Sequence, residues 1–325
     1  MYIGADLAAW LADPEWQASG SKTAAKLAQG WVEHPSVEAL KRDLQAMETK
    51  TAQGVLAAAE AFMDRADLGA LIRELIEAAA ENPFFRPYFL VLATDIADGL
   101  VLYADPHVMI SLGVTSADAL AAKKSGKRGP TSIAFTGLTT VFRFLKAGGA
   151  TLSFWEAPEI KADFIGEEGG HCRMTDRRRI EDGESVRLDG RTQSFVIEHA
   201  TSDIVILQAA VQSESAPLTV EYDSESLAMV GAASTDEASS RVQMMVSLLR
   251  VMGRTDAAPL VARLIERSPF YTRWYLMREL LALDAEAALP VLEAMGSADP
   301  HPEVRAAAAE TLALFFGDGA RGEAA

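Results

Sequence analysis

A repeat with a period of 31 residues, near the C-terminus, constrains the fold of this chain more than any other feature. Pro259 and Pro290 lie 31 residues apart. Three apolar residues that close helical runs recur at the same interval: Met252, Leu283 and Leu314. Such a period is typical of stacked helix pairs, because a single pair cannot bury its apolar face alone. Residues 236–317 are therefore predicted to form an α-solenoid.

The last repeat unit shows a family resemblance. It reads "DPHPEVRAAAAETLALF", with Asp299 before the helix, Val304 and Arg305 in its first turns, a stripe of small residues and Leu312 near its end. This pattern resembles the HEAT repeat, and the period near 31 resembles the short variety in phycobilin-lyase-type repeats. The resemblance implies HEAT-like helix pairs, which mostly present surfaces to other proteins.

The N-terminal residues 1–98 show helical periodicity, which predicts a helical domain or a cap on the region that follows. Apolar residues recur at spacings of three and four at Val37, Leu40, Leu44 and Met47. We expect Ser36 to cap this helix. The stretch "PEWQASGSKT", residues 14–23, is predicted to be a loop.

Residues 99–235 are predicted to be rich in β-strands. Residues 99–114 suggest two strands joined by a turn at Asp105-Pro106, and residues 140–155 suggest a β-hairpin. Gly148 and Gly149 would supply the positive φ angles of its tight turn. Four more strands are expected at residues 185–188, 194–199, 204–211 and 217–222. This spacing predicts an antiparallel sandwich or barrel, so the fold class is α+β with several domains.

The turns in "RRRIEDGESVRLDGRTQSFVIEHATSDIVILQ" resemble those of the cupin family of small β-barrels. The resemblance covers residues 138–222. Metal-binding cupins carry a His-x-His pair and a Glu on the first hairpin, and a further His after the second turn. Here "TLSFWEAPEI" holds no histidine, and Gln193 or Ser194 follows the second turn. A metal site needs three or four converging ligands. We therefore predict a cupin-like barrel that lacks the usual metal centre, and we expect the protein to hold no cofactor.

The stretch "GGHCRMTDRRRIEDGE", residues 169–184, concentrates unusual chemistry around the only cysteine. Arginines nearby would lower the pKa of the Cys172 thiol and make it a better ligand. An alternative prediction is therefore a divergent divalent-metal site from His171, Cys172 and His199. Neighbouring residues of a strand face opposite ways, so His171 and Cys172 would converge only from a loop.

Three arginines of the same stretch suggest an anion site. Arg177, Arg178 and Arg179 would clamp a carboxylate or phosphate through bidentate hydrogen bonds. The alternative is solvated surface charge that balances the acids of residues 181–184.

The segment "SPFYTRWYLMREL", residues 268–280, combines aromatic residues with arginines, the types that dominate protein-interface hot spots. Helical geometry places Tyr271, Trp274 and Arg278 on one face and Arg273 on another. These four residues are the predicted partner-binding residues.

Charge and composition narrow the function further. The net charge of −16 and the pI near 4.8 argue against nucleic-acid binding and against docking on anionic membranes. One cysteine allows no intrachain disulfide, and no apolar run is long enough for a membrane span. Since the N-terminus also lacks a signal-peptide pattern, we expect a cytoplasmic protein. Residues 318–325 are predicted to be a disordered tail.

Together these patterns predict a non-catalytic binding protein: an adaptor, accessory protein or regulatory subunit that docks a protein partner through its HEAT-like repeats. Two alternatives remain open. One is a metal-dependent cupin-type enzyme with a divergent site, and the other is a sensor that binds a small molecule in the barrel cavity.

Overall fold

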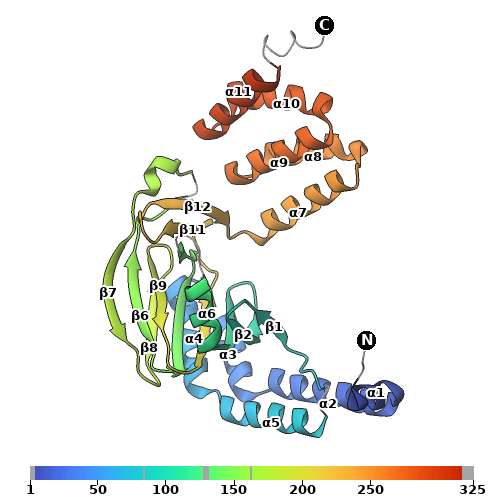
Figure 1. Cartoon of the computed structure of the whole chain (residues 1–325), viewed down its shortest axis with the longest axis vertical. Helices are drawn as coiled ribbons and strands as arrows, with labels where there is room; N and C mark the ends of the chain where they lie inside the picture. The colour runs from blue at the N-terminus through green and yellow to red at the C-terminus, as the bar shows by residue number, and fades with distance from the viewer. Residues whose placement is uncertain (1–3, 83–84, 127–131, 162, 317–325) are drawn as a thin grey trace. The chain divides into compact units, whose positions relative to one another are not determined.

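A computed structural model describes residues 4–82, 85–126, 132–161 and 163–316 of the chain, which divides into two compact units (Figure 1). The N-terminal unit comprises Met1–Gly129, Leu138–Trp155 and Met174–Ser215, and the C-terminal unit comprises the remainder. This division differs from the three predicted domains, because the first helices share a unit with most of the strands. The predicted tail, residues 318–325, lies outside the described residues.

Five helices begin the N-terminal unit: α1 (Ala5–Ala12), α2 (Pro14–Val32), α3 (Pro35–Gln45), α4 (Ala52–Arg65) and α5 (Leu68–Glu81). The prediction of a loop at residues 14–23 is wrong, because this stretch starts α2. The Asp13 carboxylate accepts hydrogen bonds from the backbone N–H groups of Glu15 and Trp16 at 2.9 and 3.1 Å. With Pro14 in the first turn, these are strong helix-start signals that outweigh the serines and glycine downstream.

The start of α3 also differs from the prediction. His34, not Ser36, is the N-cap, and its Nδ1 accepts a hydrogen bond from the Ser36 backbone N–H at 3.3 Å. Ser36 is buried in the first turn, where its hydroxyl donates to the Arg65 carbonyl at 3.1 Å. The serine therefore ties α3 to the end of α4 instead of capping its own helix.

A six-stranded antiparallel sheet forms the centre of the N-terminal unit. Its order is β1 (Leu90–Ala93), β2 (Ala97–Ala104), β3 (Val108–Thr115), β10 (Ile204–Val211), β5 (Thr139–Lys146) and β8 (Ser185–Asp189). The turn predicted at Asp105-Pro106 is confirmed. The Asp105 carboxylate accepts hydrogen bonds from the backbone N–H groups of His107 and Val108, as in an Asx-turn.

The N-terminal helices cover one face of this sheet and share its core. Buried residues of α3 and α4, such as Leu40 and Phe62, pack in one cluster with Val141 and Leu207 from the strands. The Trp31 indole donates a hydrogen bond to the Leu102 carbonyl at 2.8 Å. These helices are therefore part of the sheet's own hydrophobic core.

A three-stranded sheet, β7 (Arg173–Arg179), β6 (Thr151–Glu156) and β9 (Gln193–His199), supplies the other wall of a second core. The predicted hairpin at residues 140–155 is wrong in its pairing, since β5 and β6 lie in different sheets. Gly148 and Gly149 do form the tight turn, with φ of 59° and 67°. The Gly148 carbonyl accepts hydrogen bonds from the Thr201 and Ser202 backbone, which directs the chain from one sheet to the other.

The C-terminal unit begins with a three-stranded sheet of β12 (Met229–Ser234), β11 (Leu218–Asp223) and β4 (Ser132–Phe135). Five helices follow: α7 (Glu237–Val251), α8 (Ala258–Arg267), α9 (Phe270–Leu283), α10 (Ala285–Ala298) and α11 (Pro302–Phe316). Neighbour contacts join α7, α9 and α11 in one layer and α8 with α10 in another. We call these five helices the helical array.

The 31-residue period corresponds to alternate helices of this array. Met252 directly follows α7 as its C-cap, Leu283 is the last residue of α9, and Leu314 lies in the last turn of α11. Within the part of the chain that the structure describes, no helix has the length and apolar run that crossing a bilayer requires.

Candidate functional site

A groove in the helical array brings together two of the predicted partner-binding residues. Trp274 and Arg278 line it from α9, one helical turn apart. The groove has a volume of about 580 Å³. Its other lining residues are Leu281, Ala282, Ala285, Thr311 and Phe315. We call this feature the α9–α11 groove.

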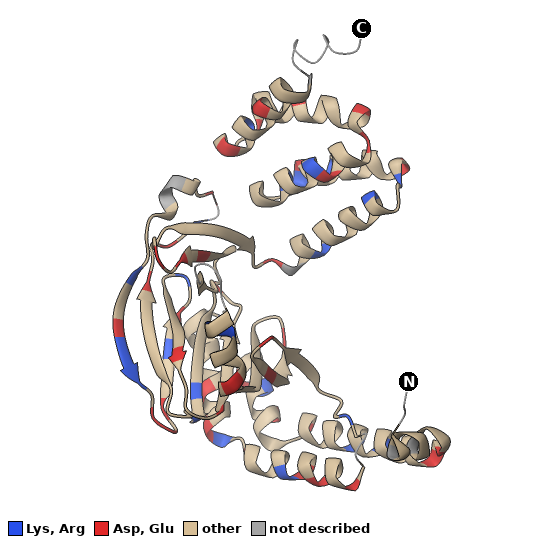
Figure 2. Ribbon diagram, viewed as in Figure 1, with Lys and Arg blue, Asp and Glu red and all other residues tan. Residues whose placement is uncertain are grey.

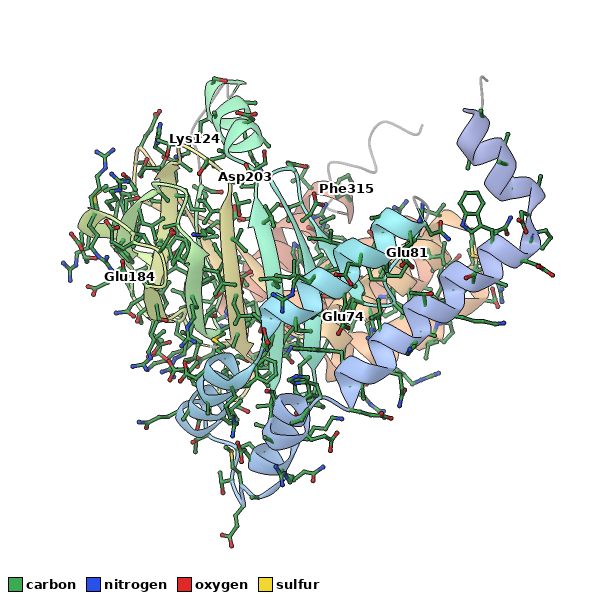
Figure 3. All side chains as sticks on the ribbon, turned by 90° about the horizontal axis from the view of Figure 1, so that it is seen from below. Glu74, Glu81, Lys124, Glu184, Asp203 and Phe315 are labelled. Atoms are coloured by element: carbon green, nitrogen blue, oxygen red, sulfur yellow. The ribbon has the colours of Figure 1, made fainter. Side chains whose placement is uncertain are left out.

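Two polar groups in the α9–α11 groove are uncommitted. Among the described residues, the exposed Arg278 guanidinium has no hydrogen-bond or ion-pair partner, and the Trp274 indole N–H has no acceptor. By contrast, the Thr311 hydroxyl donates to the Ala307 carbonyl at 2.7 Å. The groove therefore offers one cation and one neutral donor beside mainly apolar walls, and Phe315 in these walls is 67% exposed. Figure 3 labels Phe315 on α11.

Arg273, also predicted to bind a partner, has a structural role instead. Its Nε and Nη2 donate to the two carboxylate oxygens of Asp299 at 2.8 and 2.7 Å, and its Nη1 donates to the Ser268 carbonyl at 3.0 Å. The pair is largely buried, with 14% of the arginine and 4% of the aspartate side chain exposed. Tyr271, the fourth predicted residue, contacts Phe270 edge to face at 5.4 Å and is not among the groove's lining residues.

The three arginines predicted to hold an anion lie on β7, a strand that Figure 2 shows with several charged residues. All residues of β7 are exposed. Because side chains alternate along a strand, Arg178 faces away from Arg177 and Arg179. The Arg178 guanidinium donates to Glu184 at 2.6 Å and lies 5.1 Å from the centre of the Phe154 ring. The three guanidinium groups therefore do not converge on one point.

Arg178 and the Glu181 backbone also affect Glu184. Burial raises the pKa of this carboxyl, but the hydrogen bonds from the Glu181 N–H and from Arg178 outweigh it, so the net pKa is lowered. Glu184 is thus a carboxylate that holds Arg178 within the fold.

The structure also places the three residues of the predicted divergent metal site. His171 is exposed and pairs its backbone with Ala228 in an isolated bridge, whereas Cys172 is buried. His199 is exposed at the end of β9. Among the described residues, no three His, Cys, Asp or Glu side chains are grouped to hold a metal ion. The metal centre of cupins therefore does not fit the side chains that the structure describes.

The expectation of a lowered Cys172 pKa is wrong. Burial raises the pKa of this thiol. The neighbouring Arg173 is exposed and paired with Glu156. The backbone N–H of Cys172 donates to the Leu227 carbonyl at 2.9 Å. Close by, the buried Tyr222 hydroxyl donates to the Gly169 carbonyl at 2.7 Å, and burial, followed by the charge of Cys172, raises its pKa to about 12. The stretch around Cys172 is thus a packed corner.

A polar pair that was not expected from the sequence lies on one face of the six-stranded sheet. Gln208 on β10 lies opposite Ser111 on β3 and Phe142 on β5, on the face away from the N-terminal helices. Phe142 packs edge to face with Phe195 at 4.9 Å. Neither the Gln208 amide nor the buried Ser111 hydroxyl has a hydrogen-bond partner among the residues described. A lone amide in the apolar strand "IVILQAAV" is the only signal for this pair.

No family model matches the chain, and no curated protein matches it. Among solved structures, the chain is similar to a cupin domain from Bordetella pertussis Tohama I, with 11% identity over 38% of this chain and 99% of that one and a TM-score of 0.23. It is also similar to KdgF from Halomonas sp., with 12% identity, coverage of 39% and 96%, and a TM-score of 0.23. A structure of Fe(II)-HppE with an alternative substrate gives 12% identity, coverage of 58% and 96%, and a TM-score of 0.26. With TM-scores this low, these similarities carry no argument on the fold or the activity of this chain.

Proposed function

We propose that this protein is a binding protein that docks a partner protein in the α9–α11 groove. The observation that carries the proposal is the uncommitted Arg278 guanidinium beside Trp274 in a mainly apolar groove. Arginine and tryptophan are the side chains most enriched among residues that dominate binding energy. In this array the neighbouring Arg273 is used internally, whereas Arg278 lines the groove and has no partner among the described residues.

The groove's chemistry specifies the segment that it would accept. Leu281, Ala282 and Ala285 favour apolar side chains, and Arg278 favours a carboxylate, with which a guanidinium forms two parallel hydrogen bonds. The proposed occupant is therefore a short amphipathic segment of another protein that carries an acidic group next to apolar residues. A volume of about 580 Å³ accommodates several side chains of such a segment.

Selection from a library of random short peptides on the full chain tests this proposal. We expect the selected peptides to combine apolar residues with Asp, Glu or a free C-terminal carboxylate. Arg278→Ala should weaken their binding about tenfold, because it removes a charge-assisted hydrogen bond. Arg263→Ala is the matched control, since Arg263 is an exposed arginine of α8 outside the groove. Peptides without acidic groups, or with unchanged affinity for the Arg278 variant, would contradict the proposal.

A second candidate function rests on Gln208 and Ser111. These unpaired polar groups beside Phe142 and Phe195 favour an uncharged small molecule with an aromatic ring, as in the sensor alternative. If this is correct, benzamide should raise the melting temperature of the protein, and the benzoate anion should not. Gln208→Leu should remove the effect of benzamide.

A further inference from the structure

A second groove lies in the N-terminal unit, between α5 and the face of the six-stranded sheet that the helices cover. It has a volume of about 330 Å³. Five residues of α5, from Leu71 to Ala79, form one wall, and Phe85 and Pro87 contribute from the segment before β1. The opposite wall consists of three leucines of β2 and β3: Leu100, Leu102 and Leu112. We call this feature the α5–β2 groove.

The walls of the α5–β2 groove are hydrocarbon. All ten residues that line it are apolar. The acids of α5 do not border it, because Glu74, Glu77 and Glu81 recur at helical spacing on the side of the helix opposite the groove. A polar group that entered would lose its water without gaining a side-chain partner from these walls. A peptide would bring its backbone amides into these surroundings, whereas an alkyl chain brings only carbon and hydrogen.

The groove is long and narrow. Its lining residues extend along α5 from Leu71 to Ala79, which is about 12 Å at the rise of an α-helix. Carbon–carbon bonds of about 1.5 Å give an extended chain of about ten carbons the same length. Leu71 and Leu102 are buried at the base of the groove, whereas Ile76 is 62% exposed at its rim. This shape fits an unbranched alkyl chain that enters from solvent.

A cation lies beside the rim. Arg86 stands in the chain between the lining residues Phe85 and Pro87, and its side chain is exposed. Among the described residues, the Arg86 guanidinium has no hydrogen-bond or ion-pair partner. A guanidinium forms two parallel hydrogen bonds with a carboxylate. The charge therefore favours an alkyl chain that ends in an acid.

We propose that the α5–β2 groove binds a free medium-chain fatty acid of about ten carbons, with its alkyl chain along α5 and its carboxylate at Arg86. The volume of the groove lies at the lower end of the range of ligand pockets, as a single chain of this length requires. The site shares no residue with the α9–α11 groove. It also lies on the opposite face of the sheet from Gln208 and Ser111, so it goes beyond both functions proposed above.

Titration calorimetry of the full chain with hexanoate, octanoate, decanoate and dodecanoate, each below its micelle concentration, tests the fit of the chain. We expect the affinity to rise about fourfold for each added CH₂ group, because each group leaves water. The rise should stop at about ten carbons, where the chain fills the length of α5 that lines the groove. Absence of saturable binding would overturn the proposal. So would an affinity that keeps rising through dodecanoate, which indicates partition onto general apolar surface.

A comparison of octanoate with 1-octanol tests the head group. Arg86→Ala should weaken octanoate binding about fivefold, since an exposed ion pair is lost, and should leave 1-octanol binding unchanged. Arg73→Ala is the matched control, because Arg73 is an exposed arginine of α5 outside the lining of the groove. Equal affinities of the wild-type protein for octanoate and 1-octanol would contradict the role of Arg86.

A pair of tryptophan substitutions tests the location. Ala79→Trp places an indole in the groove and should abolish decanoate binding. Ala80→Trp puts the same ring one residue further along α5, outside the lining, and should leave binding unchanged. Both alanines are exposed, so both variants should fold like the wild type. Equal decanoate binding by the two variants would show that the fatty acid binds elsewhere and would overturn the proposal.

Discussion

The core between the two sheets of the N-terminal unit and the α9–α11 groove of the C-terminal unit use aromatic side chains and arginines in different ways. In the N-terminal unit, phenylalanines such as Phe144 and Phe195 pack between the two sheets, and surface arginines such as Arg178 are paired with acids. In the C-terminal unit, Trp274 and Phe315 line an open groove and Arg278 has no partner among the described residues. Its buried charge, the Arg273–Asp299 pair, lies inside the array.

The difference follows from how each architecture closes. Two facing sheets enclose a core that both walls contribute to, so large apolar side chains have a place away from water. In a two-layer array every helix keeps one side open to solvent, and the first and last helices keep more. Open apolar surface is therefore available for binding at the α9–α11 groove of the C-terminal unit, and the N-terminal unit also exposes apolar side chains, such as Ile76, Leu90 and Val91, outside its core.

The largest effect is expected for Phe144→Ala in the N-terminal unit. Phe144 is fully buried, and its truncation leaves a cavity that should cost about 4 kcal/mol of unfolding free energy. Hydrogen exchange followed by mass spectrometry should show lost protection in β5 and β10 and unchanged protection in α9. Val114→Ala, at an exposed position of β3, should change neither. Equal loss of protection in α9 would show that the two units do not open separately.

A second test concerns the buried ion pair of the helical array. Asp299→Ala leaves the Arg273 guanidinium buried without its carboxylate, which should cost about 3 kcal/mol in the free energy of unfolding. The urea midpoint of the array should fall accordingly. Asp256→Ala, which removes the acid of an exposed pair with Arg254, should leave this midpoint unchanged. Similar midpoints for both variants would mean that the internal pair has no special role.

The smallest effect is expected for the pH dependence of stability that Glu198 of β9 contributes. Burial raises the pKa of this carboxyl, but the hydrogen bond from Ser153 and the charges of Lys124 and Arg177 outweigh it, so the folded pKa lies below the ordinary value for a glutamate. Because the pKa of Glu198 is lower in the folded state than in the unfolded state, the ionised carboxylate stabilises the fold above the unfolded pKa. This stability is lost as pH falls through the folded pKa.

Glu198→Gln should therefore lower the unfolding free energy near pH 7 by less than about 1 kcal/mol, since the site is partly screened by solvent. Near pH 3 the difference between variant and wild type should shrink. Urea titrations at the two pH values measure it. A difference that grows on acidification would contradict the direction of this pKa shift.

Features set by neighbouring residues were predictable from the sequence. The Asp105-Pro106 turn depends on a carboxylate and two N–H groups within three residues, and both strands beside it are confirmed. Helical spacing alone placed Trp274 and Arg278 together. The glycine turn at Gly148-Gly149 was also visible, because only its own φ angles decide it.

Features set by distant partners were not predictable. The separation of β5 and β6 into different sheets involves hydrogen bonds from Thr201 and Ser202 to the turn at Gly148, which no local pattern reveals. Strand β7 was missed as a full strand, because all of its residues are exposed and it has no apolar alternation. Arg273 and Arg278 look alike in the sequence, and only the position of Asp299, 26 residues away, separates their roles.

The position of Trp274 has a practical consequence. Indole emission responds to the polarity of its surroundings, and this ring borders the α9–α11 groove directly. Any molecule that enters the groove displaces water from the ring and changes the emission. The chain has five tryptophans, so Trp274→Phe supplies the blank that isolates this signal. The protein therefore carries its own fluorescent reporter, and ligands can be screened without attaching a dye.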